Sequence, residues 1–148
     1  MGREYPDRPI VGVGAVVLGP GGVLLIRRAK PPRQGQWSLP GGAQKTGETV
    51  FDAARREVLE ETGLEVDILG LVDVVDSIRR DAAGKVRYHY TLVDVVAVAT
   101  EPGNPIAGSD ARDAAWMALE DISGLDLWSE TERVIGLAAE MAAALGKL

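Results

Sequence analysis

The 148-residue sequence has no cysteine, which excludes a disulfide bond, a thiolate nucleophile and any cysteine-based zinc or iron–sulfur site. Basic residues are also in deficit: 16 Lys and Arg stand against 22 Asp and Glu, a net charge of −6. This charge disfavours long nucleic acids and anionic membranes as partners, because both bind through clustered positive charge. No hydrophobic run approaches the about 20 residues of a membrane-spanning helix, and residues 1–10 are too polar for a signal peptide. We therefore expect a cytoplasmic protein.

The remaining composition, 46% hydrophobic and 26% charged, is ordinary for a globular protein, and the length suits one domain over residues 1–148. Apolar stretches separated by Gly and Pro turns predict strands in two hairpins, with helices following each. The expected strands are residues 10–18, 23–26, 37–39, 64–77, 86–100 and 114–119, with an exposed loop at 27–36 that ends at Gly41–Gly42. The expected helices are 50–62 and 129–145, the second capped by Ser129 with Glu132. This order predicts an α/β (α+β) sandwich with a mixed β-sheet.

The helix expected at 50–62 carries an unusual group of carboxylates. Thr49 gives it a capping residue and Gly63 a stop signal. At 3.6 residues per turn, Glu57, Glu60 and Glu61 share one face, next to the apolar stripe that must face the core. Like charges at this spacing repel, and a divalent cation with hard oxygen ligands, Mg²⁺ or Mn²⁺, would offset the repulsion. The alternative is a solvated helix face whose glutamates pair with the neighbouring arginines.

The residues around these glutamates form a longer pattern. From Gly42 to Leu64 the chain reads G-x5-E-x7-R-E-U-x-E-E-x-G-U, where U is a bulky aliphatic residue. This pattern resembles the Nudix box at all nine specified positions, and a chance match at ordinary residue frequencies is far below about one in a million. The flanking Trp37-Ser38-Leu39-Pro40 segment and the order of the hairpins also resemble this family.

The resemblance implies a Nudix-type α/β/α sandwich that hydrolyses a nucleoside diphosphate linked to another group. By position, it implies that Glu57, Glu60 and Glu61 bind Mg²⁺, with Mn²⁺ as a possible substitute, and that the Gly41 carbonyl completes the metal shell. Glu57 would also take a proton from the attacking water. Arg56 would orient Glu57, and Glu48 would contact Arg56 or a ligated water.

The resemblance also suggests a substrate class. The layout of the second hairpin and of residues 109–116 is most similar to ADP-ribose or ADP-sugar pyrophosphatases. The proline that often marks the ADP-ribose subgroup is absent, since residues 78–81 read Ile-Arg-Arg-Asp, so a MutT-like (d)NTP pyrophosphohydrolase is the alternative. A non-catalytic nucleotide sensor is a third reading. The partner is then a small nucleotide, and a homodimer is compatible with the sequence.

Weaker signals lie outside the box. A cationic stretch precedes the box and consists of Arg27, Arg28, Lys30 and Arg33. It predicts binding of phosphate or ribose, for which Arg27 and Arg28 are our candidates. The alternative is a solvated loop edge. Asp110 is the further acidic candidate near the site, and Glu101 competes with it. We interpret the single histidine, the strand glycines and two tryptophans as structural; these are His89, Gly12, Gly14, Trp37 and Trp116.

Overall fold

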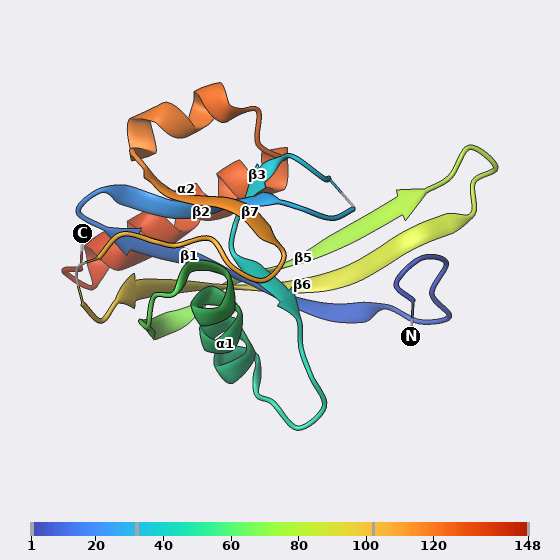
Figure 1. Ribbon diagram of the computed structural model, residues 1–148, viewed down its shortest axis with the longest axis horizontal. Helices are drawn as coiled ribbons and strands as arrows, with labels where there is room; N and C mark the ends of the chain where they lie inside the picture. Colours follow the sequence, from blue (N-terminus) through green and yellow to red (C-terminus); the bar gives the residue numbers. More distant parts are fainter. Residues whose placement is uncertain (1, 32, 102, 148) are drawn as a thin grey trace.

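Seven strands and three helices form the computed structural model, which describes residues 2–31, 33–101 and 103–147 (Figure 1). In chain order they are β1 Ile10–Gly19, β2 Gly22–Arg28, β3 Trp37–Ser38, β4 Gly41–Ala43, α1 Val50–Thr62, β5 Val66–Arg80, β6 Val86–Ala99, β7 Ala111–Met117, the 3₁₀ helix η1 Leu119–Leu125 and α2 Ser129–Ala144. The predicted α/β (α+β) class is therefore confirmed.

The strands belong to one mixed sheet in the order β3-β2-β1-β6-β5. β1 and β6 run parallel, whereas β1 with β2 and β5 with β6 are the two predicted antiparallel hairpins. β4 pairs with residues 12–14 near the start of β1, and β7 pairs with β2. The pairing of β4 brings the beginning of the predicted box directly against the central strand.

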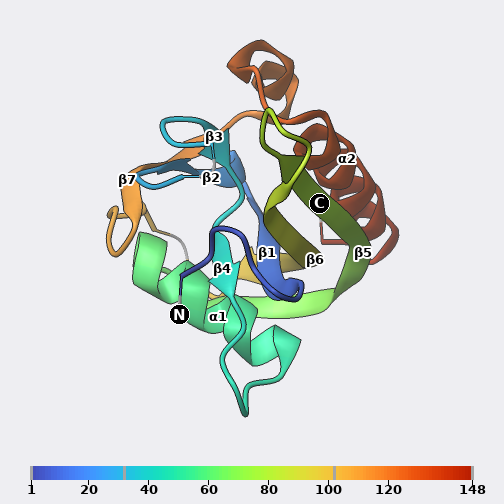
Figure 2. The ribbon, with the colours of Figure 1, turned by 90° about the vertical axis from the view of Figure 1, so that its right-hand side faces the viewer.

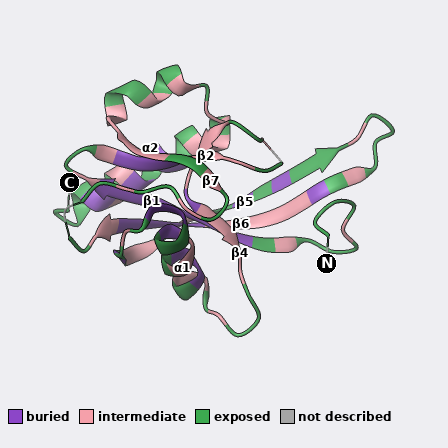
Figure 3. Cartoon of the chain, in the orientation of Figure 1, coloured by how far each residue is buried: buried purple, intermediate pink, exposed green. Residues whose placement is uncertain are grey.

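The two α-helices cover opposite faces of the sheet, which makes the fold a sandwich (Figure 2). Successive side chains of a strand point to opposite faces, so Val13, Ala15 and Val17 of β1 pack on the α1 side. Val16 and Leu18 pack on the α2 side. Burial on both faces explains why β1 is a nearly continuous apolar run, and Figure 3 shows the buried residues gathered where the layers meet.

The predicted limits of the first helix are confirmed, because local signals define them. The Thr49 side chain accepts a hydrogen bond from the Asp52 N–H at 3.1 Å, and Gly63 ends α1 in the left-handed conformation with φ 74°. The second helix is predicted correctly in position but not in its cap: Trp128 is the N-cap residue and Ser129 is already helical. In the described part of the chain, no helix is long and apolar enough to cross a membrane.

Three other predictions need correction. The loop expected at 27–36 begins later, because β2 continues through Arg28 by pairing with β7; Pro32 of this loop lies outside the described residues. Gly41–Gly42 does not end a loop but forms β4, because it can pair with β1. The strand expected at 114–119 begins at Ala111 and ends at Met117, where η1 follows after one residue. Each error concerns pairing with a distant strand, which a local pattern does not encode.

Candidate active site

Arg56 on α1 is the centre of an ion-pair network. Its Nε and Nη2 donate to Glu48 Oε2 at 2.6 Å and Oε1 at 2.9 Å, a bidentate pair, and Nη2 also donates to the Ala43 carbonyl at 3.1 Å. Its Nη1 reaches Glu57 Oε1 at 2.8 Å and Glu60 Oε2 at 3.3 Å. Arg56 lowers the pKa of Glu48 to about 2, chiefly through these hydrogen bonds, and its own pKa is raised. Arg56 thus joins the loop before α1 to two of its glutamates.

The glycine pair of β4 passes very close to the carboxylates of α1. A Cβ atom on Gly42 would lie 2.5 Å from Glu57 Oε1, and one on Gly41 would lie 2.0 Å from the Val13 carbonyl oxygen. Only glycine fits either position without a shift of its neighbours. The Gly41 N–H donates to Glu61 Oε1 at 2.7 Å, so β4 also holds the Glu61 carboxylate in place.

Glu61 is the most deeply buried of these glutamates, with 4% of its surface exposed. Burial raises its pKa to about 8, and the nearby charges of Glu57 and Asp110 raise it further, while the Gly41 N–H and Arg28 act in the opposite direction. A carboxylate in this setting needs added positive charge to be ionised at neutral pH.

Glu57 and Glu61 line a cavity of about 240 Å³ with Arg28, Lys30 and Asp110. The loop that carries Asp110 is docked on the end of α1: the N–H groups of residues 106 and 108 donate to the carbonyls of residues 62 and 61 at 2.9 and 3.1 Å. Lys30 binds the Asp110 carboxylate at 2.9 Å. The cavity therefore combines clustered carboxylates with two cationic side chains at its edge.

The donor set of this cavity suits a hard divalent cation, because carboxylate and carbonyl oxygens are the ligands that Mg²⁺ and Mn²⁺ prefer. Among the described residues, no three acidic or histidine side chains already converge as a complete metal site. Glu60 is exposed, and its carboxylate lies 3.3 Å from Arg56 Nη1. The structure thus brings Glu57, Glu61 and Gly41 together and holds Glu60 beside them.

Several candidate residues lie elsewhere. Arg27 lines neither this cavity nor a neighbouring one: alternation along β2 turns it to the other face, where it stacks on Trp37 and lies 3.5 Å from Asp113. Arg33 stacks on Trp128, 4.0 Å from the ring centre. The remaining three are outside the cavity lining; they are Glu101, His89 and Trp116, whose indole N–H donates to the Gly103 carbonyl.

Two buried polar residues were missed by the sequence reasoning. Asp94 of β6 and Ser77 of β5 are 6% and 4% exposed, and they lie on the α2 side of the sheet. A signal for Asp94 was available, because it interrupts the apolar run from Leu92 to Val98. A charged residue in the middle of a buried strand is rare unless it has a partner.

Comparisons with known proteins add to this geometry. A sequence model described as the NUDIX domain matches residues 8–136. The chain is 36% identical over 117 residues to the ADP-ribose pyrophosphatase of Methanocaldococcus jannaschii, covering 79% of this chain and 66% of that protein. It is 34% identical to the oxidized purine nucleoside triphosphate hydrolase of Danio rerio, and the match covers 78% of this chain and 70% of that protein. The crystal structure of a MutT NUDIX hydrolase from Burkholderia pseudomallei matches with a TM-score of 0.71 and 34% identity. The match covers 88% of this chain and 98% of that one.

Proposed function

Because this chain belongs to the Nudix family and is a hydrolase that acts on phosphoric anhydrides, we propose that it cleaves the diphosphate of a nucleoside diphosphate linked to another group. One observation carries the proposal: Glu57 and Glu61 share a cavity with Arg28 and Lys30, so metal-binding and phosphate-binding groups face the same space. We further propose that residues 1–148 form one domain acting in the cytoplasm, as a monomer or a homodimer.

The reaction depends on a divalent cation in this proposal. Glu57, Glu60, Glu61 and the Gly41 carbonyl are the donors we assign to it. Mg²⁺, or Mn²⁺ in its place, supplies positive charge that neutralises phosphate oxygens and acidifies the attacking water when bound. The high pKa of Glu61 supports this assignment, since a buried carboxylate surrounded by other carboxylates favours a bound cation.

We assign the remaining catalytic and binding roles to side chains of this chain. Glu57 takes the proton from the water that attacks phosphorus, and its contact with Arg56 at 2.8 Å orients the carboxylate. Glu48 acts through Arg56, which it holds by two hydrogen bonds. Arg28 and Asp110 are the substrate contacts that we retain at the cavity edge, whereas the orientation of Arg27 on the opposite face removes it from this group.

Two substrate classes remain within this reaction. ADP-ribose or an ADP-sugar is the first, supported by the name of the Methanocaldococcus jannaschii relative. A (d)NTP, cleaved to a nucleoside monophosphate and pyrophosphate, is the second, supported by the name of the Danio rerio relative. The classes differ in the group beyond the diphosphate, so the second product, a sugar phosphate or pyrophosphate, separates them.

The test is a panel of ADP-ribose, an ADP-sugar, a dinucleotide and purine (d)NTPs, incubated with Mg²⁺, with Mn²⁺ or with a chelator. We expect metal-dependent release of a nucleoside monophosphate, with either a sugar phosphate or pyrophosphate as the second product. Tight binding of one nucleotide without metal-dependent turnover of any member would instead identify a non-catalytic sensor.

A further inference from the structure

Three carboxylates line the cavity of the candidate active site, those of Glu57, Glu61 and Asp110. The first is paired with a guanidinium that binds several acceptors at once, and the second with a backbone N–H of β4. Neither partner can leave without disturbing the loop before α1 or the sheet. Asp110 is paired with Lys30, Nζ to Oδ1 at 2.9 Å, and both side chains are more than half exposed. Because exposed ion pairs are weak, this pair exchanges partners most easily of the three.

The backbone on both sides of this ion pair is held in place. The Ala29 N–H donates to the Asp110 carbonyl at 3.0 Å, so the segment that carries Lys30 is joined to the loop that carries Asp110. That loop approaches α1 closely, since a Cβ on Gly108 would lie 2.7 Å from the Glu60 carbonyl oxygen. An exchange of partners therefore requires rotation of the two side chains and no movement of the fold.

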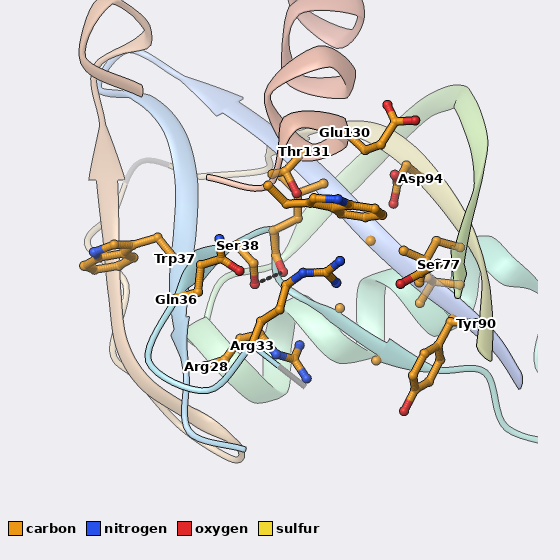
Figure 4. Close-up of a pocket in the computed structure, with 18 of the residues that line it drawn as sticks. Arg28, Arg33, Gln36, Trp37, Ser38, Ser77, Tyr90, Asp94, Glu130 and Thr131 are labelled. Atoms are coloured by element: carbon orange, nitrogen blue, oxygen red, sulfur yellow. Dashed lines mark hydrogen bonds between the residues drawn. The ribbon is translucent and has the colours of Figure 1, made fainter. Parts of the chain in front are cut away.

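Two other cations of this segment are placed differently. Arg28 lines the cavity of the carboxylates and also a second cavity, of about 120 Å³, which adjoins it and reaches the start of α2 (Figure 4). Arg33 lines that second cavity, where it stacks on Trp128 (Figure 4). Within the described residues, Lys30 belongs to the lining of the first cavity and not of the second. Its charge therefore acts where the three carboxylates meet.

We propose that Lys30 is a displaceable counter-ion of Asp110, which it releases when a divalent cation binds in this cavity. The inference rests on the proposed function and refines the role of Asp110 in it. Beside such a cation the Asp110 carboxylate is attracted and the Lys30 ammonium repelled, so Asp110 turns inward and Lys30 loses its partner. The freed ammonium can then bind a phosphate oxygen of the substrate. Metal binding and phosphate binding thereby strengthen each other through one residue.

The test is a double-mutant cycle on metal affinity, measured by titrating the metal-free protein with Mn²⁺ in the absence of phosphate and following free Mn²⁺ by EPR. Lys30→Met removes the charge and leaves Asp110 without its partner, so Mn²⁺ should bind roughly 3–5-fold more tightly. In an Asp110→Asn background the same change should leave the affinity nearly unchanged. There is then no carboxylate to release, and an unpaired ammonium extending into water is screened. Lys30→Arg keeps the ion pair and should bind Mn²⁺ as the unaltered protein does.

Lys147→Met, which removes an exposed lysine outside the lining of both cavities, is the matched control and should not change the Mn²⁺ affinity. An equal gain from Lys30→Met in both backgrounds would overturn the inference, because it would show a general effect of charge instead of an exchange of partners. The absence of any gain would overturn it as well. On a hydrolysed substrate, Lys30→Met should also raise KM more than it lowers kcat, and an unchanged KM would contradict the transfer of Lys30 to phosphate.

The failure of this inference is distinct from that of the proposed function. If the two substitutions are coupled in the cycle but no phosphoric anhydride is hydrolysed, the exchange stands and the proposed reaction fails. If hydrolysis is metal-dependent but the two substitutions act additively, the reaction stands and the exchange fails.

Discussion

The guanidinium of Arg56 holds the carboxylate of Glu48 in a bidentate pair, with N–O distances of 2.6 and 2.9 Å. The same guanidinium reaches Glu57 at 2.8 Å. A planar guanidinium can bind in several directions at once, which a lysine ammonium on a flexible chain does not reproduce. Glu48 therefore fixes Arg56, and Arg56 fixes Glu57, so the loop before α1 positions a carboxylate of the active site.

Arg56→Lys tests this relay. The substitution keeps the positive charge but loses the bidentate geometry, so turnover should fall roughly 10–100-fold, as for other residues that orient a metal ligand. The measurement is kcat with KM, alongside a melting curve to show that the variant is folded. Arg55→Lys is the matched control, because Arg55 is an exposed neighbour that contacts only Asp52 among the described residues. Equal kcat for both variants would contradict the relay.

The two glycines of β4 should respond differently to alanine. In Gly42→Ala the new methyl meets the far end of the Glu57 side chain, so the protein should fold while the displaced carboxylate lowers kcat by roughly 100-fold. In Gly41→Ala the methyl meets the backbone of Val13, and stability itself should fall. Activity assays and urea unfolding of both variants separate the effects. A fully active Gly42→Ala protein would show that the placement of Glu57 is not critical.

The capping of α1 gives a stability prediction. Thr49→Ala removes the acceptor for the Asp52 N–H and should lower the free energy of unfolding by about 1 kcal/mol. Ser129→Ala provides the comparison, because Ser129 makes no capping hydrogen bond at the start of α2. Urea unfolding of both variants measures the difference. A loss in Ser129→Ala as large as that in Thr49→Ala would contradict the assignment of the caps.

The buried carboxyl of Asp94 predicts how stability depends on pH. Its pKa is about 7 in the folded protein and 3.8 for the unperturbed group, so folding favours the protonated form. The stabilisation is complete below about pH 4 and is lost as the pH rises toward 7. Asp94→Asn should therefore be more stable than the unaltered protein at pH 8, by up to about 4 kcal/mol, with the difference shrinking at low pH. Urea unfolding between pH 4 and 8 measures it. A difference that does not vary with pH would contradict the burial of an ionisable Asp94.

These sites show what the sequence could and could not reveal. The limits of α1 were predictable because Thr49 and Gly63 act within one helical turn. The carboxylate face of α1 followed from helical spacing alone. By contrast, the approach of Gly42 to Glu57 depends on the pairing of β4 with β1, which joins segments far apart in the chain. Long-range strand pairing leaves little local signal, so it had to be observed.

The cavity on the α2 side was hidden for the same reason. Asp94 and Ser77 come from two strands and face the start of α2, so only the assembled sandwich brings them to one space. The orientation of Arg27 was accessible in principle, because alternation separates it from Arg28 once β2 is known to extend that far. The prediction ended β2 at residue 26, because the charged residues that follow are typical of an exposed loop.

The central claim is that Glu57 performs the chemistry of anhydride hydrolysis, and Glu57→Gln tests it most directly. The substitution preserves the size of the side chain and removes its charge, so the account predicts an unchanged melting temperature and a loss of turnover of roughly 100-fold or more. Glu65→Gln, an exposed glutamate just beyond α1, is the matched control and should remain fully active. The measurement is the rate of nucleoside monophosphate release with Mg²⁺ on the best substrate of the panel. A folded Glu57→Gln protein that turns over as fast as Glu65→Gln would remove Glu57 from the mechanism.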